Sequence, residues 1–239
     1  MKKMIIICFT LILAVTSGCN INDNQNSKTE AVKSIDMDPK DLPKVPAFQD
    51  KATREYMAST KEVEPGYYLL ESELKGFTMS FPINGKIIER LTENDGENYE
   101  TIIFESNNPK TNISITGDMS YFYNKDYTLE TIINSVKGEN GYKGYFNKTI
   151  KPEKEIYFAY KKTVFNNPDR KYNDFYMYFG YIKSTEVKHS GIEFSFIIKC
   201  LKDEKSCNLN EASARKKANK MIDSITFNVN KKEQKKRQQ

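Results

Sequence analysis

The sequence predicts an α+β fold in which an antiparallel β-sheet of about six strands packs against helices. Several segments alternate apolar and polar residues, as half-buried strands do, and two others space their apolar residues as helices do. The two kinds of segment do not alternate regularly along the chain. A doubly wound parallel sheet needs that alternation, so an antiparallel sheet covered by helices is the better interpretation.

Three strands are predicted in the first half. Residues 77–81 alternate large apolar residues with Thr and Ser, and Pro82 follows them. Proline lacks the N–H that a strand interior needs, so it marks the end of this strand. Further strands are expected over residues 99–105 and 112–117, after a short helix over residues 49–59.

A helix is predicted next, in the middle of the chain. Its apolar residues follow the spacing of one helical face: Leu129, Ile132, Ile133 and Val136. Thr128 is a suitable N-cap, and Gly138 is expected to end the helix.

The second half adds three strands and a closing helix. The strands are expected over residues 155–165, 174–183 and 191–201, and the last of them alternates cleanly. The closing helix begins after a cap at Asn210 and runs to about Asp223.

The N-terminus has the layout of a secretory signal peptide. Lys2 and Lys3 form a basic region, residues 4–15 form an apolar run, and small residues precede Cys19. A membrane-spanning helix needs about 20 apolar residues, so this run is too short to be one. The predicted signal peptide is therefore residues 1–18.

The segment Thr16-Ser17-Gly18-Cys19 resembles the lipobox of bacterial lipoproteins, as found in Gram-positive species. The resemblance implies cleavage between Gly18 and Cys19, followed by S-diacylglycerol and N-palmitoyl groups on Cys19. Two or more acyl chains hold a protein firmly on a bilayer. The expected location is the cell membrane, facing outside the cytoplasm. The alternative is an ordinary signal peptide that happens to have a cysteine nearby.

Four regions follow from this layout. After the signal peptide come a lipidated flexible tether (19–47), a single globular domain (48–230) and a basic tail (231–239). The tether is polar and carries three prolines, a composition that buries too little surface to fold. The tail is either solvated or in contact with anionic lipid or wall polymer.

Two cysteines are left once Cys8 leaves with the signal peptide and Cys19 carries lipid. Cys200 and Cys207 are close in sequence, and in an oxidising compartment such a pair suggests a disulfide. Two free thiols are the alternative. A zinc site is not expected because there is no second cysteine pair and His189 is the only histidine. No cofactor is predicted.

The net charge gives no reason to expect a nucleic-acid partner. Loss of Lys2 and Lys3 lowers the formal net charge from +5 to +3, which is weakly basic for a chain of this length. The extracytoplasmic location argues against nucleic acid as well.

The globular part also resembles a known fold. The segments Gly-Phe-Thr-Met-Ser-Phe-Pro (76–82) and Lys-Met-Ile-Asp-Ser-Ile-Thr-Phe (220–227), with a helix between them, look like the PsbP-like fold over about residues 66–228. The resemblance implies an α/β/α sandwich around an antiparallel sheet. It implies binding or assembly roles rather than catalysis, and it supplies no catalytic residues.

Familiar catalytic motifs are absent from the sequence: there is no Gly-x-Ser-x-Gly, no phosphate-binding Gly-x-x-x-x-Gly-Lys and no His-Glu-x-x-His. His189 could act as a general base, but a solvated histidine in a turn is the commoner case. Asp118, Asp126 and Glu130 allow a glycosidase-like acid pair without indicating one.

Aromatic residues supply the binding candidates. The run 175–181 is either a central strand covered on both faces or a surface that presents Tyr176 and Tyr178 to a glycan or protein. Tyr142 and Tyr145 flank a predicted loop and belong to the same hypothesis.

These observations favour a lipid-anchored extracytoplasmic protein with a non-catalytic binding or assembly role in the cell envelope. Its partners would be the membrane, through the lipid, and an envelope protein or wall polymer. Surface behaviour such as colony or biofilm development is one process it could serve. The alternatives are an envelope hydrolase acting on a glycan or peptide, and a solute-binding lipoprotein, for which the chain is short.

Overall fold

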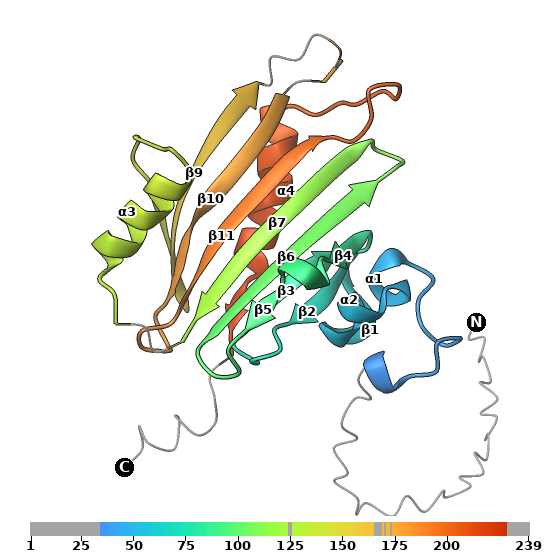
Figure 1. The fold of residues 1–239 in the computed structure, drawn as a ribbon, viewed down its shortest axis with the longest axis horizontal. Coiled ribbons are helices and arrows are strands. Elements are labelled where there is room, and N and C mark those ends of the chain that lie inside the picture. The colour runs from blue at the N-terminus through green and yellow to red at the C-terminus, as the bar shows by residue number, and fades with distance from the viewer. Residues whose placement is uncertain (1–33, 124–125, 165–168, 170, 173, 229–239) are drawn as a thin grey trace, which may run out of the picture. The chain divides into compact units, whose positions relative to one another are not determined.

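Two antiparallel sheets form the framework of the computed structural model (Figure 1). The structure describes residues 34–123, 126–164, 169, 171–172 and 174–228, all of which belong to one compact unit. The predicted signal peptide, the cleavage and lipidation site at Gly18 and Cys19, and the basic tail 231–239 lie outside the described residues. No described helix is long and apolar enough to cross a membrane.

The larger sheet has eight strands in the order β4-β6-β7-β11-β10-β9-β8, with β5 paired to β6. Its strands are β4 (Gly85–Ile87), β5 (Glu93–Asn94), β6 (Tyr99–Asn108), β7 (Ile113–Phe122), β8 (Asn147–Lys151), β9 (Lys154–Val164), β10 (Asp174–Ser184) and β11 (Gly191–Cys200).

The smaller sheet has four strands in the order β1-β2-β3-β12. They are β1 (Met57–Glu64), β2 (Tyr67–Glu71), β3 (Phe77–Pro82) and β12 (Thr226–Phe227). The last strand comes from the C-terminal end of the described chain and pairs with β3, so the smaller sheet joins strands from the early and the last parts of the sequence.

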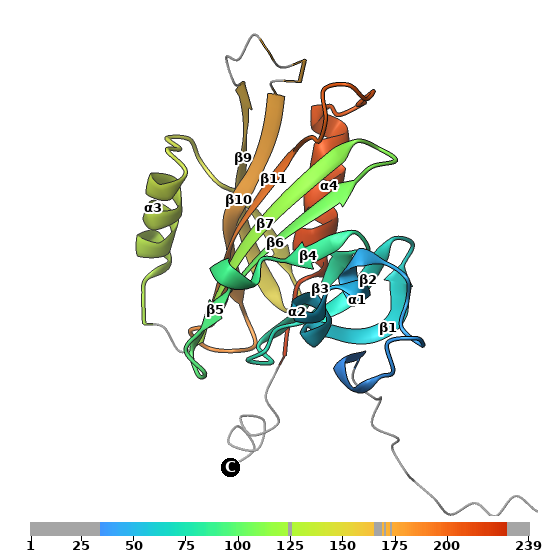
Figure 2. The same cartoon turned by 45° about the vertical axis from the view of Figure 1, so that its right-hand side comes forward.

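Helices lie on opposite faces of the larger sheet (Figure 2). α3 (Leu129–Glu139) packs on what we call the outer face, where Ile132 and Val136 meet Phe179 and Tyr181. α4 (Glu211–Ser224) lies on the inner face, and the main core there includes residues of both sheets. The remaining helices are short: η1 (Ser34–Asp36), α1 (Pro46–Gln49), α2 (Lys51–Glu55) and η2 (Glu89–Leu91).

The α+β class and the antiparallel pairing agree with the sequence analysis, but the expected single sheet of about six strands is wrong, because the described residues form twelve strands in two sheets. The helix expected over residues 49–59 is shorter than predicted. α2 ends at Glu55, and β1 begins at Met57. β8 is polar and mostly exposed, and β1 is mostly polar with only Met57 buried, so both lack the apolar alternation that marks a half-buried strand. Thr128 caps α3 as expected, but the helix continues past Gly138 to Glu139.

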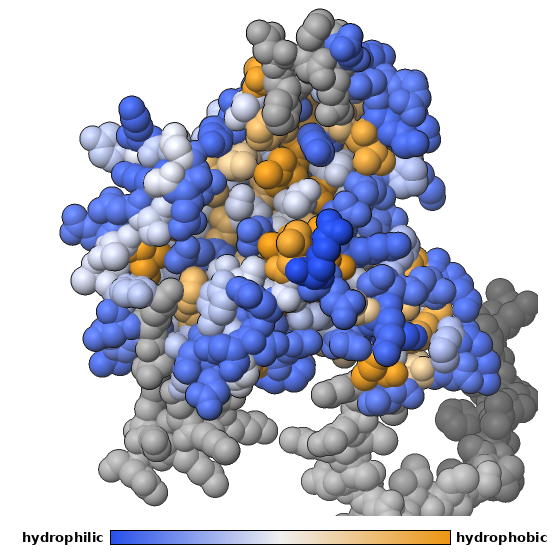
Figure 3. Space-filling model, viewed as in Figure 1, coloured by the Kyte–Doolittle hydropathy of each residue, from blue (hydrophilic) through white to orange (hydrophobic). Residues whose placement is uncertain are grey.

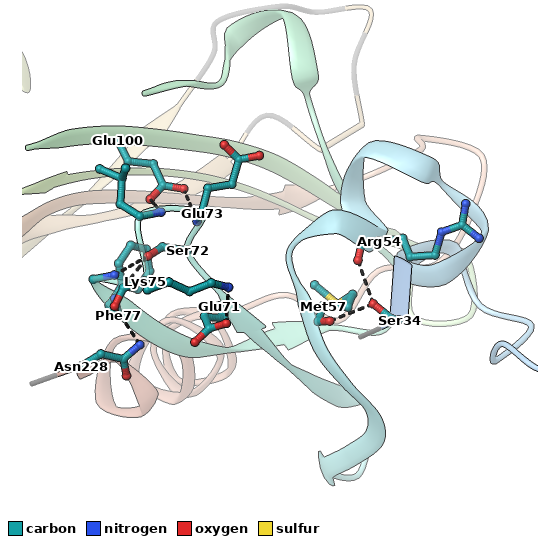
Figure 4. A network of polar contacts seen from close by, with 12 residues as sticks. Ser34, Arg54, Met57, Glu71, Ser72, Glu73, Lys75, Phe77, Glu100 and Asn228 are labelled. Carbon is teal, nitrogen blue, oxygen red and sulfur yellow. Dashed lines mark hydrogen bonds and ion pairs between the residues drawn. The ribbon is translucent and has the colours of Figure 1, made fainter. Parts of the chain in front are cut away.

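The folded region begins earlier than the expected boundary at residue 48. Ser34 is buried, and its hydroxyl donates to the carbonyl oxygens of Arg54 and Met57, both at 2.8 Å (Figure 4). Leu42 is also buried in the main core. Only a few widely spaced residues of this stretch are buried. Its average composition is polar, and for that reason the sequence analysis assigned it to the tether.

A buried carboxylate joins the two sheets. Glu100 on β6 is fully buried and accepts hydrogen bonds from the backbone N–H groups of Glu73 (2.8 Å) and Leu74 (3.2 Å) (Figure 4). These two residues lie in the turn between β2 and β3. Burial raises the pKa of Glu100, and the backbone donors partly offset that effect.

Candidate functional site

A hollow lies on the outer face of the larger sheet, between α3 and the β6–β7 end of the sheet. Its volume is about 760 Å³, and a shallower extension of about 90 Å³ shares Ser120, Glu139 and Glu193 with it. We call the two together the acidic groove. Figure 3 views this face, where mostly hydrophilic residues surround paler and hydrophobic ones. The carboxylates of the groove are Asp95, Asp118, Glu139 and Glu193, and its aromatic residues are Tyr99, Phe122 and Tyr123.

Strand register places the floor of the groove. In a strand, alternate side chains share a face, and paired residues on neighbouring strands lie side by side. Ser120 on β7 pairs with Glu193 on β11, and Asp118 pairs with Ser195. Carboxylates and hydroxyls therefore lie next to one another across these two strands.

Aromatic rings form one end of the groove. Tyr99 at the start of β6 pairs with Phe122 at the end of β7, and their ring centroids are 5.2 Å apart. The loop before Tyr99 is fixed by Asp95, whose Oδ1 accepts from the backbone N–H groups of Glu97, Asn98 and Tyr99 at 2.7–2.9 Å. These hydrogen bonds lower the pKa of Asp95, so it remains ionised.

Asp118 has the opposite electrostatic character. Its surface remains open to the groove, but the protein around it displaces water, and this desolvation raises its pKa. The negative charge of Glu139 on α3 raises it further. Glu139 itself accepts a hydrogen bond of 2.9 Å from the hydroxyl of Ser135. The groove therefore contains carboxyl groups with different affinities for protons.

This arrangement suits a ligand that carries amino and hydroxyl groups. Carboxylates form strong charge-assisted hydrogen bonds with ammonium groups, and aromatic faces attract cations. Among the described residues, no group of three or more His, Cys, Asp or Glu side chains could hold a metal ion.

Two of the aromatic candidates are in the core, which corrects their interpretation as binding residues. Tyr176 and Tyr178 are 6% and 0% exposed on the inner face of β10, and Tyr178 stacks on Tyr160 with centroids 5.6 Å apart. The neighbouring Phe179 and Tyr181 point to the outer face, where α3 covers them. The aromatic run is a central strand covered on both faces.

Tyr142 and Tyr145 lie between α3 and β8 and do not line the acidic groove. Tyr142 packs edge-on against Phe146 and Phe179, with centroids 5.9 and 5.3 Å away. Tyr145 is 92% exposed, so it stays available for contact with a partner.

The structure pairs Cys200 and Cys207 in a disulfide with Cα atoms 6.0 Å apart. The loop between them is held from the β6–β7 turn. Asn112 donates from its side-chain amide to the carbonyl oxygens of Lys202 (2.8 Å) and Lys205 (3.0 Å). The disulfide therefore closes a loop that is already fixed by polar contacts.

His189 lies between β10 and β11 in a left-handed conformation, with φ of 58°. Its Nδ1 is 3.6 Å from Oδ1 of Asp126. It lines a second cavity of about 510 Å³ at the N-terminal end of α3, away from the acidic groove. The hydroxyl of Ser190 has no hydrogen-bond partner among the described residues, so it forms no nucleophile pair with His189.

Most groove residues were not predicted from the sequence. No local sequence pattern marked Glu139, Glu193 or the aromatic residues of the groove as binding residues. Each residue type is common in a helix or strand of this kind. The available signal was the polar alternate positions of β7 and β11, but it points to a shared site only once the two strands are known to pair.

Comparisons with known proteins identify the family. The family model described as "Putative lipoprotein YvcA" matches residues 43–226. The "Putative lipoprotein YvcA" of Bacillus subtilis (strain 168) is 51% identical over 240 residues, covering 98% of this chain and 100% of that protein. A solved structure, LpqN involved in cell envelope biogenesis of Mycobacterium tuberculosis, is a distant match with a TM-score of 0.36 and 12% identity, covering 68% of this chain and 91% of its own. By the family model and the Bacillus relative, the chain belongs to the YvcA lipoprotein family.

Proposed function

We propose that the protein is held on the outer face of the cell membrane by lipid on Cys19 and binds an envelope component without catalysis. Membership of a lipoprotein family and the lipobox-like segment support the anchor. The acidic groove supports the binding role. Surface behaviour such as colony or biofilm development is where we expect loss of this binding to be visible.

One observation carries the choice of partner: acidic and aromatic side chains share one open groove beside several hydroxyl groups. Aromatic rings and carboxylates together favour ammonium groups over neutral or anionic ones. The hydroxyls of Ser120, Ser135 and Ser195 add sites for hydrogen bonds with sugars. We therefore propose an amine-bearing wall polymer as the partner of the groove.

A matched pair of ligands tests this proposal. The processed chain from residue 19, made with Cys19→Ala to keep it unlipidated, is titrated by calorimetry with a glucosamine oligosaccharide and with its fully N-acetylated form. Acetylation removes the positive charge and keeps the sugar chain. We expect measurable binding of the amine form and at least a tenfold weaker affinity for the acetylated form.

Variants connect the binding to the groove. Asp118→Asn with Glu193→Gln keeps the shape and removes two charges, and we expect it to weaken binding about tenfold or more, as loss of charge-assisted hydrogen bonds does. Glu130→Gln, an exposed acid on α3 that does not line the groove, is the control and should bind normally. Equal binding of both oligosaccharides, or no effect of the double variant, would show that the groove does not bind amines.

A second candidate function is hydrolysis of a glycan, which the pairing of Asp118 with Glu139 favours. Asp118 and Glu139 line the same part of the groove, the pKa of Asp118 is raised, and glycosidases use two carboxyl groups with different pKa values as acid and base. Release of reducing ends from a wall glycan by the wild type, lost in Asp118→Asn, would establish catalysis. Binding without release by the wild type supports the non-catalytic role.

A further inference from the structure

The second cavity has a different chemistry from the acidic groove. It has a volume of about 510 Å³ and lies between the N-terminal end of α3 and the loop that joins β10 to β11. Tyr127, Leu129 and Ile132 give it an apolar wall. Its size and its apolar wall are those of a site for a small molecule.

Two hydroxyl groups in the cavity wall have no hydrogen-bond partner among the described residues, and one of them, that of Ser190, is buried. Tyr181 is 6% exposed, and none of the described residues forms a hydrogen bond with its hydroxyl. Ser190 is 1% exposed, and its Oγ has no partner either. Buried hydroxyls nearly always have a hydrogen-bond partner, so the buried Ser190 hydroxyl points to a polar group supplied by a ligand, and the Tyr181 hydroxyl in the same wall offers that group a second hydrogen bond.

Gly191 makes room for the tyrosine hydroxyl. A Cβ at this position would lie 2.1 Å from the hydroxyl oxygen of Tyr181, so any other residue would displace the ring. Burial, together with the nearby charge of Glu193, strongly raises the pKa of Tyr181. The group therefore remains a hydrogen-bond donor at any physiological pH.

The wall carries two lysines, Lys183 and Lys188, and two acids, Glu155 and Glu186, so its formal charges balance. Lys183 lies opposite Glu155 in the register of β9 and β10, but neither lysine forms an ion pair with a described acid. Glu155 is already bound by Lys148 (3.1 Å) and by the hydroxyl of Tyr157 (2.6 Å).

The two lysines remain available to a ligand because the acids of the wall have partners of their own. Glu186, the remaining acid, has an interaction of its own. His189 adds positive charge when protonated, although Asp126 lies 3.6 Å from it. The N-terminus of α3 contributes the positive end of its dipole at the same place.

We propose that this cavity binds a small anionic amphiphile. Its phosphate or carboxylate group would be held by Lys183, Lys188 and the hydroxyl of Tyr181. Its apolar body would lie against Leu129 and Ile132. The proposal does not depend on the acidic groove, because the two sites favour ligands of opposite charge.

The chain has no tryptophan, so one introduced residue gives a clean fluorescence reporter. Tyr127→Trp places it at the cavity wall, where Tyr127 is 55% exposed. The processed chain with Cys19→Ala is titrated with phenyl phosphate, inorganic phosphate, benzyl alcohol and benzylamine. We expect a saturable change with phenyl phosphate, at least tenfold weaker binding of inorganic phosphate and benzyl alcohol, and none of benzylamine. Tyr145→Trp, at an exposed site outside the cavity, is the control and should not respond.

Variants in the Tyr127→Trp background assign the contacts. Lys183→Met with Lys188→Met should weaken phenyl phosphate binding at least tenfold, and Tyr181→Phe about three- to tenfold. Tyr181→Phe keeps the ring and should unfold at the same temperature as the parent. Binding of benzylamine as tight as that of phenyl phosphate, no binding of phenyl phosphate, or unchanged affinity in the lysine variant would each overturn the proposal.

The anionic group could belong to a free solute or to a lipid headgroup, and vesicles distinguish the two. A response to phosphatidylglycerol vesicles but not to glycerol phosphate would assign the site to lipid, and the reverse result would assign it to a solute. Both results support an anion site. An equal response to phosphatidylcholine vesicles, which carry no net charge, would contradict it.

Discussion

The ammonium group of Lys154 donates a hydrogen bond of 2.7 Å to the backbone carbonyl oxygen of Asp223. The same group also donates to the carbonyl oxygens of Ile222 and Ile225. The last carbonyl groups of a helix lack partners within the helix, and a cation there is favourable. Lys154 at the start of β9 therefore ties the larger sheet to the end of α4, just before the chain enters β12.

Replacing this lysine should cost much of the protein's stability. Lys154→Met keeps the length of the side chain but leaves buried carbonyl groups without a donor, and we expect a loss of about 2–4 kcal/mol in the free energy of unfolding. Urea denaturation measures it. Lys151→Met, which removes an exposed ion pair of 3.7 Å to Asp223, is the matched control and should change stability by less than about 1 kcal/mol. Equal effects of the two variants would refute this role of Lys154.

Lys154 should also make stability rise with pH over a defined range. Burial lowers its pKa from 10.5 to about 8 in the folded protein. Between these values the unfolded chain binds more protons than the folded chain, so raising the pH stabilises the fold. Burial raises the pKa of Tyr178 from 10.0 to about 12, which has the opposite effect above pH 10. We expect the melting temperature to rise above pH 8 and to fall again above about pH 10. Lys154→Met should abolish the rise.

Glu100 is predicted to matter as an acceptor rather than as a charge. Glu100→Ala would leave the N–H groups of Glu73 and Leu74 unpaired in the interior, at a cost of about 2–4 kcal/mol. Each carboxylate oxygen accepts from one of these N–H groups, so Glu100→Gln loses one acceptor but avoids burying a charge, and it should cost about 1–2 kcal/mol, less than Ala. Chemical denaturation of both variants near neutral pH checks this order. If Gln proved as damaging as Ala, one acceptor oxygen would not be enough, and this prediction would be wrong.

The acidic groove should lose affinity for amines on mild acidification. Burial and the charge of Glu139 raise the pKa of Asp118 above its usual 3.8, so this carboxylate takes up a proton earlier than an ordinary aspartate as the pH falls. As the pH is lowered, affinity for the glucosamine oligosaccharide should therefore begin to fall at a higher pH than it would if the pKa of Asp118 were unshifted. Glu139→Gln should move the drop toward lower pH. A pH profile of the binding affinity that is the same in both proteins would show that the two carboxyl groups are not coupled.

The parts of the fold that the sequence predicted are those with a strong local period. β6, β7, β10 and β11 alternate or are densely apolar, and α3 and α4 carry helical apolar faces with caps at Thr128 and Asn210. β8 has charged or exposed residues on both sides, and β12 has only two residues, so neither has a readable pattern.

The groove depends on pairings that no local pattern encodes. Ser120 and Glu193 lie side by side only because β7 pairs with β11 across a long stretch of intervening sequence. The aromatic run of β10 suggested a binding surface by its composition. In the structure Tyr178 is fully buried and fills space in the core. Composition identified the aromatic residues, and only the fold separates those in the core from those at the surface.

Capture of wall polymer by the anchored protein tests most directly whether the acidic groove binds it. Whole cells that produce the lipidated protein are cross-linked, the protein is purified, and bound amino sugar is quantified beside the Asp118→Asn, Glu193→Gln double variant. We predict that amino sugar is recovered with the wild type and falls to background in the double variant, with both proteins in the membrane fraction. Equal recovery from the two proteins would contradict the central claim that the acidic groove is the site of binding.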